Sequence, residues 1–218
     1  MTKAFIFDLD GTLADTLDSL HVSVNKTLEE LGLSPITREQ CRQFVGDGAR
    51  VLMERSISAV GGDGEGLLDE AMRIYGRIFE ANCTYHVVPY EGITKLLSLL
   101  RQNGMKLAVL SNKPHRQTVR VVEEIFGKQT FTWIFGQQEG IAKKPDPQAA
   151  LLIAGKLGVT PCECVYVGDS EVDVATGKAA RMKTIGVAWG FRTRGVLLEA
   201  GAEAIAGSPE EIMELIKE

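Results

Sequence analysis

The stretch Ala4-Phe5-Ile6-Phe7-Asp8-Leu9-Asp10-Gly11-Thr12 decides how the rest of the chain is interpreted. Its first four residues are all apolar, which is typical of a strand buried on both faces of a parallel sheet. Asp8 and Asp10 are two residues apart, so on an extended backbone their carboxylates project to the same side. Ligand chemistry belongs at the carboxyl end of such a strand, and Gly11 lets the chain turn away without a side chain in the cavity. The stretch predicts a phosphoryl-transfer site.

Apolar runs typical of strands recur along the chain and alternate with segments of helical periodicity. This alternation predicts an α/β fold built on a parallel sheet. A last helix is expected after Ser208, because Pro209 stands at a first helical position and Glu211 completes a capping box. The expected strands are Lys3–Phe7, Lys106–Leu110, Thr132–Phe135, Cys164–Val167 and Thr184–Ala188.

The region 15–87 has a different pattern, with apolar residues at helical spacing. These residues are Leu17, Leu20, Val24, Leu28 and Leu31. Thr37 to Gln40 has the form of a capping box before another helix. We therefore expect an all-helical domain of residues 15–87, inserted after the first strand into a core domain of residues 1–14 and 88–218. Within the insert, Gly61 to Gly66 is expected to be a flexible turn, because so many glycines cannot sustain a helix interior.

Polar residues follow two of the later strands at the point where each strand ends. Ser111-Asn112 follows the second expected strand, and Gly168-Asp169-Ser170-Glu171-Val172-Asp173 follows the fourth. The carboxyl ends of parallel strands lie along one edge of the sheet, so Ser111 and Asp169 should converge on the two aspartates of the first strand. Between them stands Lys143-Lys144-Pro145-Asp146-Pro147, whose prolines fix the backbone and aim one lysine at a defined spot.

These four elements, in this order, resemble the four motifs of the haloacid dehalogenase (HAD) superfamily. The whole chain is similar to the phosphoglycolate phosphatase-like branch, which implies a Rossmann-like HAD core with a small helical cap inserted just after the first motif. Glu91 and Arg181 depart from the family pattern, at positions that often hold proline and glycine. The resemblance is carried by residues 8–13, 44–48, 90–93, 110–114, 144–147, 167–170 and 186–190.

Phosphoryl transfer requires an in-line nucleophile, a neutralised phosphate and a proton donor for the leaving oxygen. We expect Asp8 to attack the phosphorus and form an aspartyl-phosphate. Asp10 is expected to protonate the leaving alcohol and then to take a proton from the hydrolytic water. Ser111 should donate a hydrogen bond to a phosphoryl oxygen, and Lys144 should supply positive charge.

The expected cofactor is Mg²⁺, which prefers oxygen ligands and tends to keep bound waters. Its expected ligands are Asp8, the backbone carbonyl of Asp10, and Asp169. Asp173 is expected to be an additional ligand or to support one. The alternative for Asp173 is a structural role as the cap of the helix that follows the fourth strand.

Substrate choice should lie in the helical insert, because a lid over the sheet edge excludes water and contacts the leaving group. The loop Gly46-Asp47-Gly48 offers backbone N–H groups, and Arg50 or Arg55 offers bidentate geometry for a carboxylate. The alternative is that both arginines lie on a solvated helix face. The expected substrate-binding residues are Thr12, Gly46, Gly48, Arg50 and Asn112.

The resemblance implies a magnesium-dependent phosphatase whose partner is a small phosphorylated metabolite, with 2-phosphoglycolate as the best single candidate. A pyrophosphatase or nucleotidase of the same fold is an alternative. A phosphosugar mutase similar to β-phosphoglucomutase is another, since it would use the same aspartyl-phosphate but return the phosphoryl group to the substrate. A binding protein without activity would be expected to have lost catalytic positions, and all of them are present.

Composition limits the other partners. The 218 residues, 44% of them hydrophobic, fit one domain with an insert or two small domains. A net charge of −5 and the lack of any block of like charges argue against binding to nucleic acid or to anionic membranes. The chain opens directly into a strand, and it has no apolar stretch long enough to span a membrane, so we expect a cytoplasmic protein. It is expected to be a monomer or a homodimer.

Overall fold

A computed structural model describes residues 1–62 and 65–215. Its centre is a six-stranded sheet of order β5-β4-β1-β6-β7-β8, in which all neighbouring strands are parallel. The predicted α/β fold with a parallel sheet is therefore confirmed. The strands of this sheet are β1 (Ala4–Phe7), β4 (Lys106–Pro114), β5 (Trp133–Gln137), β6 (Cys164–Gly168), β7 (Lys183–Val187) and β8 (Ala204–Ala206).

The strand β1 lies between β4 and β6, the two strands whose ends carry the other predicted polar residues. Phe7, the last residue of β1, is paired with Val109 of β4 and with Val167 of β6. The segments that follow these three strands therefore emerge side by side at one edge of the sheet. This register brings residues more than 150 positions apart in sequence to the same place.

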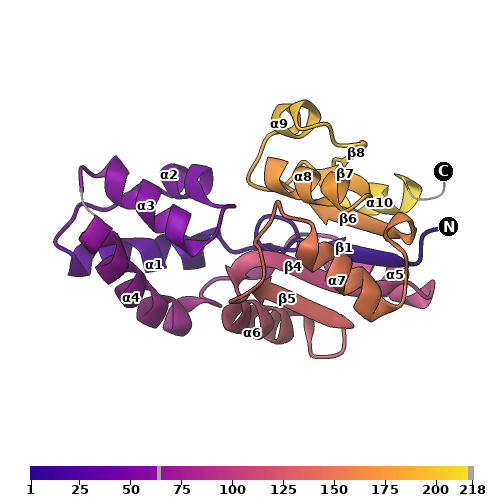
Figure 1. The fold of residues 1–218 in the computed structure, drawn as a ribbon, viewed down its shortest axis with the longest axis horizontal. Helices are drawn as coiled ribbons and strands as arrows, with labels where there is room; N and C mark the ends of the chain where they lie inside the picture. Colours follow the sequence, from indigo (N-terminus) through magenta and orange to yellow (C-terminus); the bar gives the residue numbers. More distant parts are fainter. Residues whose placement is uncertain (63–64, 216–218) are drawn as a thin grey trace.

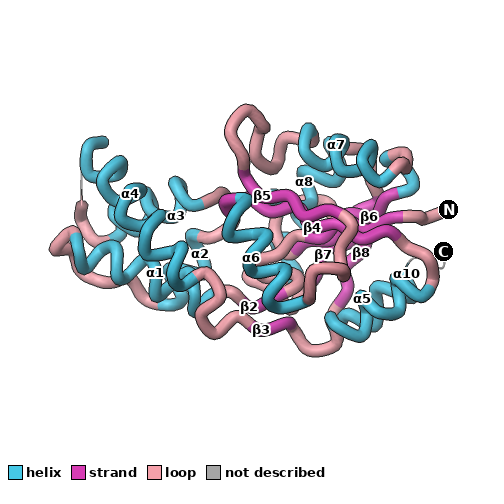
Figure 2. Tube along the Cα trace, turned by 90° about the horizontal axis from the view of Figure 1, so that it is seen from below, coloured by secondary structure: helices cyan, strands magenta, loops and turns pink. Residues whose placement is uncertain are grey.

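Helices cover both faces of the sheet (Figure 2). Phe5 and Phe7 of β1 pack into the core on the side of α5, while Ala4 and Ile6 pack into the core on the side of α7. Because both faces are buried, the strands are continuous apolar runs rather than alternating ones. The helices of this part are α5 (Ile93–Gln102), α6 (His115–Phe126), α7 (Gln148–Leu157), α8 (Glu171–Ala179), α9 (Arg194–Glu199) and α10 (Pro209–Leu215).

A group of helices follows β1 and lies at one end of the sheet, away from both termini (Figure 1). Its members in the described ranges are α1 (Leu17–Glu30), α2 (Arg38–Phe44), α3 (Ala49–Ala59) and α4 (Glu65–Asn82). The chain enters and leaves this group through a two-stranded antiparallel sheet of β2 (Ala14–Asp15) and β3 (Val88–Pro89). Because this pairing lies where the insert was expected to begin and end, we propose residues 15–87 as the cap domain.

Local signals in the sequence account for several boundaries of these helices. The capping box at the start of α2 is confirmed, since Gln40 N–H donates to Thr37 Oγ1 at 3.1 Å and Thr37 N–H donates to Gln40 Oε1 at 2.8 Å. The last helix begins at Pro209 as expected. Residues 63 and 64 of the expected glycine-rich turn lie outside the described residues, and Gly66 belongs to α4.

Other elements were not predicted. The strands β2, β3 and β8 are two or three residues long, too short to produce a periodic pattern. The strand β4 continues to Pro114, past its expected end at Leu110, and its pairing with β5 shifts register between these two residues. Within the described ranges, no helix has the length and apolar character required to cross a membrane.

Candidate active site

A pocket opens at the carboxyl edge of the sheet, beneath the helices α1–α4. Its polar lining includes Asp8, Asp10, Ser111, Asn112, Lys144 and Asp169, together with the backbone of Gly46 and Gly48. Its apolar lining includes Leu20, Val45, Leu52, Tyr75 and Phe79, all from the helical segment. The sheet edge therefore supplies groups for chemistry, and the helices supply a wall that excludes water.

Asp8 directly follows β1 and is buried. Leu9 N–H donates to Asp8 Oδ1 at 2.7 Å, and Lys144 Nζ lies 2.9 Å from the same oxygen. Lys144 is also buried, and its Nζ donates to Asp173 Oδ1 at 2.7 Å. The carboxylates of Asp8 and Asp173 therefore hold the Lys144 ammonium between them.

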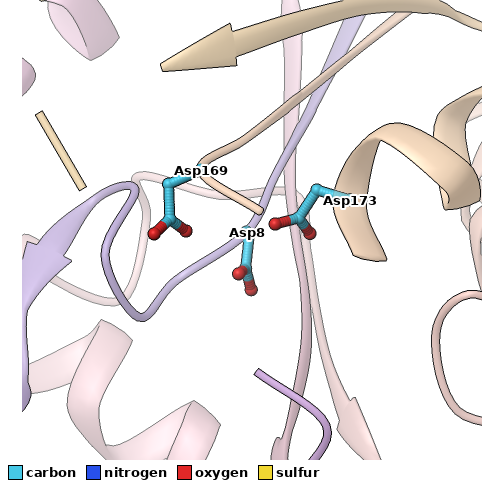
Figure 3. A group of neighbouring side chains, drawn as sticks. All are labelled: Asp8, Asp169 and Asp173. Carbon is cyan, nitrogen blue, oxygen red and sulfur yellow. The ribbon is translucent and has the colours of Figure 1, made fainter. Parts of the chain in front are cut away.

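Asp8, Asp169 and Asp173 form a buried cluster in which one carboxylate oxygen from each lies within 4.8 Å of the others. Figure 3 shows that these side chains come from the end of β1, the segment after β6 and the first turn of α8. Three carboxylates beside one lysine leave excess negative charge in a site with little water. Oxygen donors of this kind suit a hard cation, so the residues present fit Mg²⁺.

Burial raises the pKa of Asp169 to about 7, and the charge of Asp173 adds to this effect. Burial, followed by the charge of Asp173, also raises the pKa of Asp8 well above its ordinary value, although Lys144 opposes the shift. Burial disfavours the charge on Lys144, but Asp173 and Asp8 together keep its pKa well above the ordinary value. The cluster therefore carries repulsion that a cation would relieve.

We expect Mg²⁺ to stabilise the folded protein more at about pH 8 than at about pH 6. Asp8 and Asp169 have higher pKa values when folded than when unfolded, so the folded chain binds more protons. Stability without the ion should therefore fall as the pH rises from about 4 through about 7. Thermal unfolding with and without Mg²⁺ at both pH values tests this. An equal shift of the melting temperature at both pH values, or a shift retained in Asp169→Asn, would contradict it.

Asp169 is held rigidly by its neighbours. Thr12 Oγ1 donates to Asp169 Oδ1 at 3.1 Å, and Phe191 N–H donates to Asp169 Oδ2 at 2.7 Å. A Cβ atom at Gly11 would lie 2.4 Å from Asp169 Oδ2, and one at Gly190 would lie 2.3 Å from Asp169 Cβ. Gly11 also has a φ of +82°, a conformation that favours glycine. Both glycines are therefore needed for this position of the carboxylate.

Asn112 joins two loops of the site. Its Oδ1 accepts from Lys144 N–H at 2.9 Å, and its Nδ2 donates to the carbonyls of Lys144 and Gly46, both at 3.1 Å. Gly48 has a φ of +92°, and a Cβ atom there would lie 3.3 Å from the Asn112 carbonyl oxygen. These contacts place the loop before α3 directly over the Lys144 segment.

A sequence profile of the family described as "Haloacid dehalogenase-like hydrolase" matches residues 5–187. The chain belongs to the haloacid dehalogenase-like hydrolases. A phosphoglycolate phosphatase of Pseudomonas putida is 35% identical to this hydrolase over 195 residues, which cover 88% of the hydrolase and 71% of the relative. A phosphoglycolate phosphatase of Chromobacterium violaceum is 33% identical over 218 residues, which cover 99% and 96% of the two chains.

Solved structures have the same fold as this hydrolase. One from Lactobacillus delbrueckii subsp. bulgaricus, proposed to be a phosphoglycolate phosphatase, gives a TM-score of 0.90 at 33% identity over 99% of each chain. One from Thermotoga maritima, proposed to be a β-phosphoglucomutase, gives a TM-score of 0.76 at 25% identity, also over 99% of each chain. The fold and the family agree with the sequence-based expectation.

Arg50 lies away from the pocket of this hydrolase. Its guanidinium lies 2.9 Å from Asp69 Oδ1 of α4, and both side chains are largely exposed. Arg55 pairs with Asp47 Oδ2 at 2.8 Å and donates to the carbonyl of Phe44 at 3.1 Å. The geometry does not support the expected contact of Arg50 with substrate, because its side chain extends from α3 toward α4 rather than toward the sheet.

Two other predicted residues have structural partners. Thr12 is fully buried and its hydroxyl donates to Asp169, so we propose that it positions this carboxylate. Asp173 Oδ2 accepts from Ser170 N–H at 3.1 Å and from Ser170 Oγ at 2.5 Å. Asp173 therefore completes the capping box of α8, whose N-cap residue is Ser170, while its other carboxylate oxygen faces Lys144.

A reciprocal pair of arginines was not predicted. Arg192, after β7, donates to the carbonyls of Arg42 at 3.0 Å and Val45 at 2.6 Å. Arg42 donates in turn to the carbonyls of Gly190 at 2.9 Å and Phe191 at 3.1 Å. These bonds fasten α2 to the sheet edge beside Asp169. No local pattern identifies contacts between residues this far apart in sequence.

Lys113 was also missed, although its side chain lines the pocket and its Nζ lies 2.6 Å from Asp10 Oδ1. A signal for it was present. Residues two apart on an extended backbone project to the same side, and this reasoning applies to Ser111 and Lys113 as it does to Asp8 and Asp10.

Proposed function

We propose that this chain is a magnesium-dependent phosphoglycolate phosphatase that works through an aspartyl-phosphate at Asp8. The observation that carries the proposal is the buried contact of Asp8 with Lys144, 2.9 Å apart at the carboxyl end of the central strand. The curated relatives from Pseudomonas putida and Chromobacterium violaceum, both phosphoglycolate phosphatases, support the choice of substrate.

In the first half of the reaction, Asp8 attacks the phosphorus of phosphoglycolate. Leu9 N–H and Lys144 hold Asp8 Oδ1, so Oδ2 is the attacking atom. A bond forms between Oδ2 and phosphorus while the bond from phosphorus to the glycolate oxygen breaks. Protonated Asp10 gives its proton to that oxygen, and glycolate leaves.

In the second half, water attacks the phosphorus of the aspartyl-phosphate. Asp10, now a carboxylate, accepts a proton from the water. The bond between phosphorus and Asp8 breaks, which restores the Asp8 carboxylate and releases inorganic phosphate. Asp10 is again protonated and ready for the next substrate.

Fixed charges and donors stabilise the phosphoryl group during both halves. Ser111 Oγ accepts from Lys113 N–H at 3.2 Å, which leaves the Ser111 hydroxyl hydrogen free to donate to a phosphoryl oxygen. Lys144 contributes its positive charge from beside Asp8. Asp8, the Asp10 carbonyl and Asp169 would hold Mg²⁺, with Asp173 close by. When bound, the ion supplies further positive charge against the phosphoryl oxygens.

The other activities considered from the sequence have less support. The two relatives described above, which match most of the chain, are phosphoglycolate phosphatases. The structure proposed to be a β-phosphoglucomutase is more distant, with a TM-score of 0.76 against 0.90 for the proposed phosphoglycolate phosphatase. Hydrolysis is therefore favoured over return of the phosphoryl group to the substrate.

Phosphate release from a panel of phosphorylated compounds with Mg²⁺ tests the proposal. The panel contains phosphoglycolate, pyrophosphate, a nucleoside monophosphate and glucose 1-phosphate, and Asp8→Asn serves as the control for a contaminating phosphatase. We expect kcat/KM to be highest for phosphoglycolate, by about tenfold or more. A higher value for another compound would contradict the substrate, and no release from any compound would contradict the phosphatase activity.

A further inference from the structure

Among the described residues, the cationic side chains that line the pocket are Lys113, Lys144 and Arg192. Lys144 is held between Asp8 and Asp173. The guanidinium of Arg192 is occupied by the backbone carbonyls of Arg42 and Val45 and by Glu171. The proposed reaction uses Lys144 and leaves Lys113 without a role.

Lys113 is a buried ammonium with unused hydrogen-bonding capacity. Its side chain is 2% exposed, and its Nζ lies 2.6 Å from Asp10 Oδ1. An ammonium has three N–H donors, and among the described residues Asp10 is the only acceptor bonded to this Nζ. The Phe79 ring of α4 lies 5.0 Å from Nζ and contributes a cation–π contact rather than a hydrogen bond. Because a buried charge without enough partners is costly, Lys113 is ready to accept an anionic partner.

We propose that Lys113 binds the carboxylate of the leaving group and so determines specificity for phosphate esters of short 2-hydroxy carboxylic acids. This inference rests on the phosphatase function proposed above. Asp10 must come within about 2.6–3.2 Å of the ester oxygen to protonate it. In phosphoglycolate only one methylene separates that oxygen from the carboxylate. A carboxylate so close to Asp10 lies within reach of an ammonium 2.6 Å from Asp10 Oδ1.

The walls of the pocket strengthen this ion pair and limit the size of the leaving group. Leu52 and Phe79 of the helical segment line the pocket opposite the sheet edge. Apolar walls exclude water, and charge–charge attraction is much stronger without water than in it. A longer spacer between ester oxygen and carboxylate would carry the carboxylate past Lys113 toward these apolar side chains.

Paired substrates separate the role of Lys113 from general effects on catalysis. Ethyl phosphate has the same two-carbon leaving group as phosphoglycolate but lacks the carboxylate. We expect the wild type to prefer phosphoglycolate by about 100-fold or more in kcat/KM, because the uncharged ester leaves Lys113 without its partner. In Lys113→Met, which keeps the length of the side chain against Phe79, the preference should fall to within about threefold.

Three controls make the result specific to this charge. Lys113→Arg keeps the cation and should retain part of the preference. Lys128→Met removes the charge of an exposed lysine after α6 and should leave the preference unchanged. The third control uses only the wild type and a longer substrate, which has a second methylene between the ester oxygen and the carboxylate. Its kcat/KM should be lower than that of phosphoglycolate by about tenfold or more. That measurement applies even where Lys113→Met does not fold.

The outcomes distinguish this inference from the proposed function. If the wild type prefers phosphoglycolate and Lys113→Met keeps the same preference, the inference is overturned while the phosphoglycolate phosphatase stands. Equal turnover of the longer ester by the wild type also overturns the inference. If the wild type hydrolyses ethyl phosphate and phosphoglycolate with equal kcat/KM, the inference and the assigned substrate both fail. No hydrolysis of any ester would overturn the phosphatase function and the inference with it.

Discussion

Replacing Asp8 with asparagine is expected to lower phosphate release from phosphoglycolate by about 10⁴-fold or more. The asparagine Oδ1 can still accept the hydrogen bond that Leu9 N–H donates at 2.7 Å, so the site should keep its shape. An amide does not attack phosphorus, and the covalent route is lost. The fall should therefore appear in kcat rather than in KM, as measured by steady-state phosphate release with Mg²⁺.

The same substitution is expected to leave the melting temperature of the metal-free protein unchanged or higher. The charged Asp8 carboxylate is buried beside Asp169 and Asp173, and its raised pKa shows that the folded protein disfavours this charge. The asparagine side chain would carry no charge, and Lys144 would still be paired with Asp173. Thermal unfolding near neutral pH checks this. A large loss of stability in Asp8→Asn would mean that Asp8 serves the fold, and would weaken its assignment as the nucleophile.

Replacing Lys144 with methionine is expected to impair both activity and stability. The rate should fall by about 10²–10³-fold, because a positive charge beside the transferred phosphoryl group is lost. The free energy of unfolding should fall by about 3–5 kcal/mol, because Asp8 and Asp173 would remain buried without their cation. Phosphate release and urea unfolding at neutral pH measure the two effects.

Two further variants identify the source of the instability in Lys144→Met. Adding Asp173→Asn removes one of the two carboxylates left buried by Lys144→Met, the one that lies 2.7 Å from Lys144 Nζ in the wild type. The double variant should recover part of the stability but none of the activity. The matched control is Lys143→Met, because Lys143 is exposed and its stability change should stay within about 1 kcal/mol. A double variant no more stable than Lys144→Met would contradict the electrostatic explanation.

The fold could be predicted in outline because its signals are local. The buried run of β1 and the polar residues that follow it mark a central parallel strand, and the capping box at Thr37 marks the start of α2. Parallel pairing then brings Asp8, Ser111 and Asp169 to one edge without further information. The short strands β2, β3 and β8 depend on tertiary pairing and leave no pattern of their own.

The substrate side of the pocket was less predictable, because it depends on how the helices meet the sheet. Arg50 is close in sequence to the pocket loop, but the path of α3 carries its side chain to Asp69 instead. Arg192 reaches α2 from the far end of the chain. Lys113 is the exception, since its spacing from Ser111 already placed both side chains on one side of an extended strand.

The stereochemical course at phosphorus tests the covalent role of Asp8 most directly. The phosphorothioate analogue of phosphoglycolate, made chiral at phosphorus with two oxygen isotopes, is hydrolysed in water that carries the third, and the configuration of the inorganic thiophosphate is determined. Attack by Asp8 followed by attack by water gives two in-line displacements. Each inverts the configuration, so the account predicts overall retention. Overall inversion would show that water displaces glycolate in a single step, and would contradict an aspartyl-phosphate at Asp8.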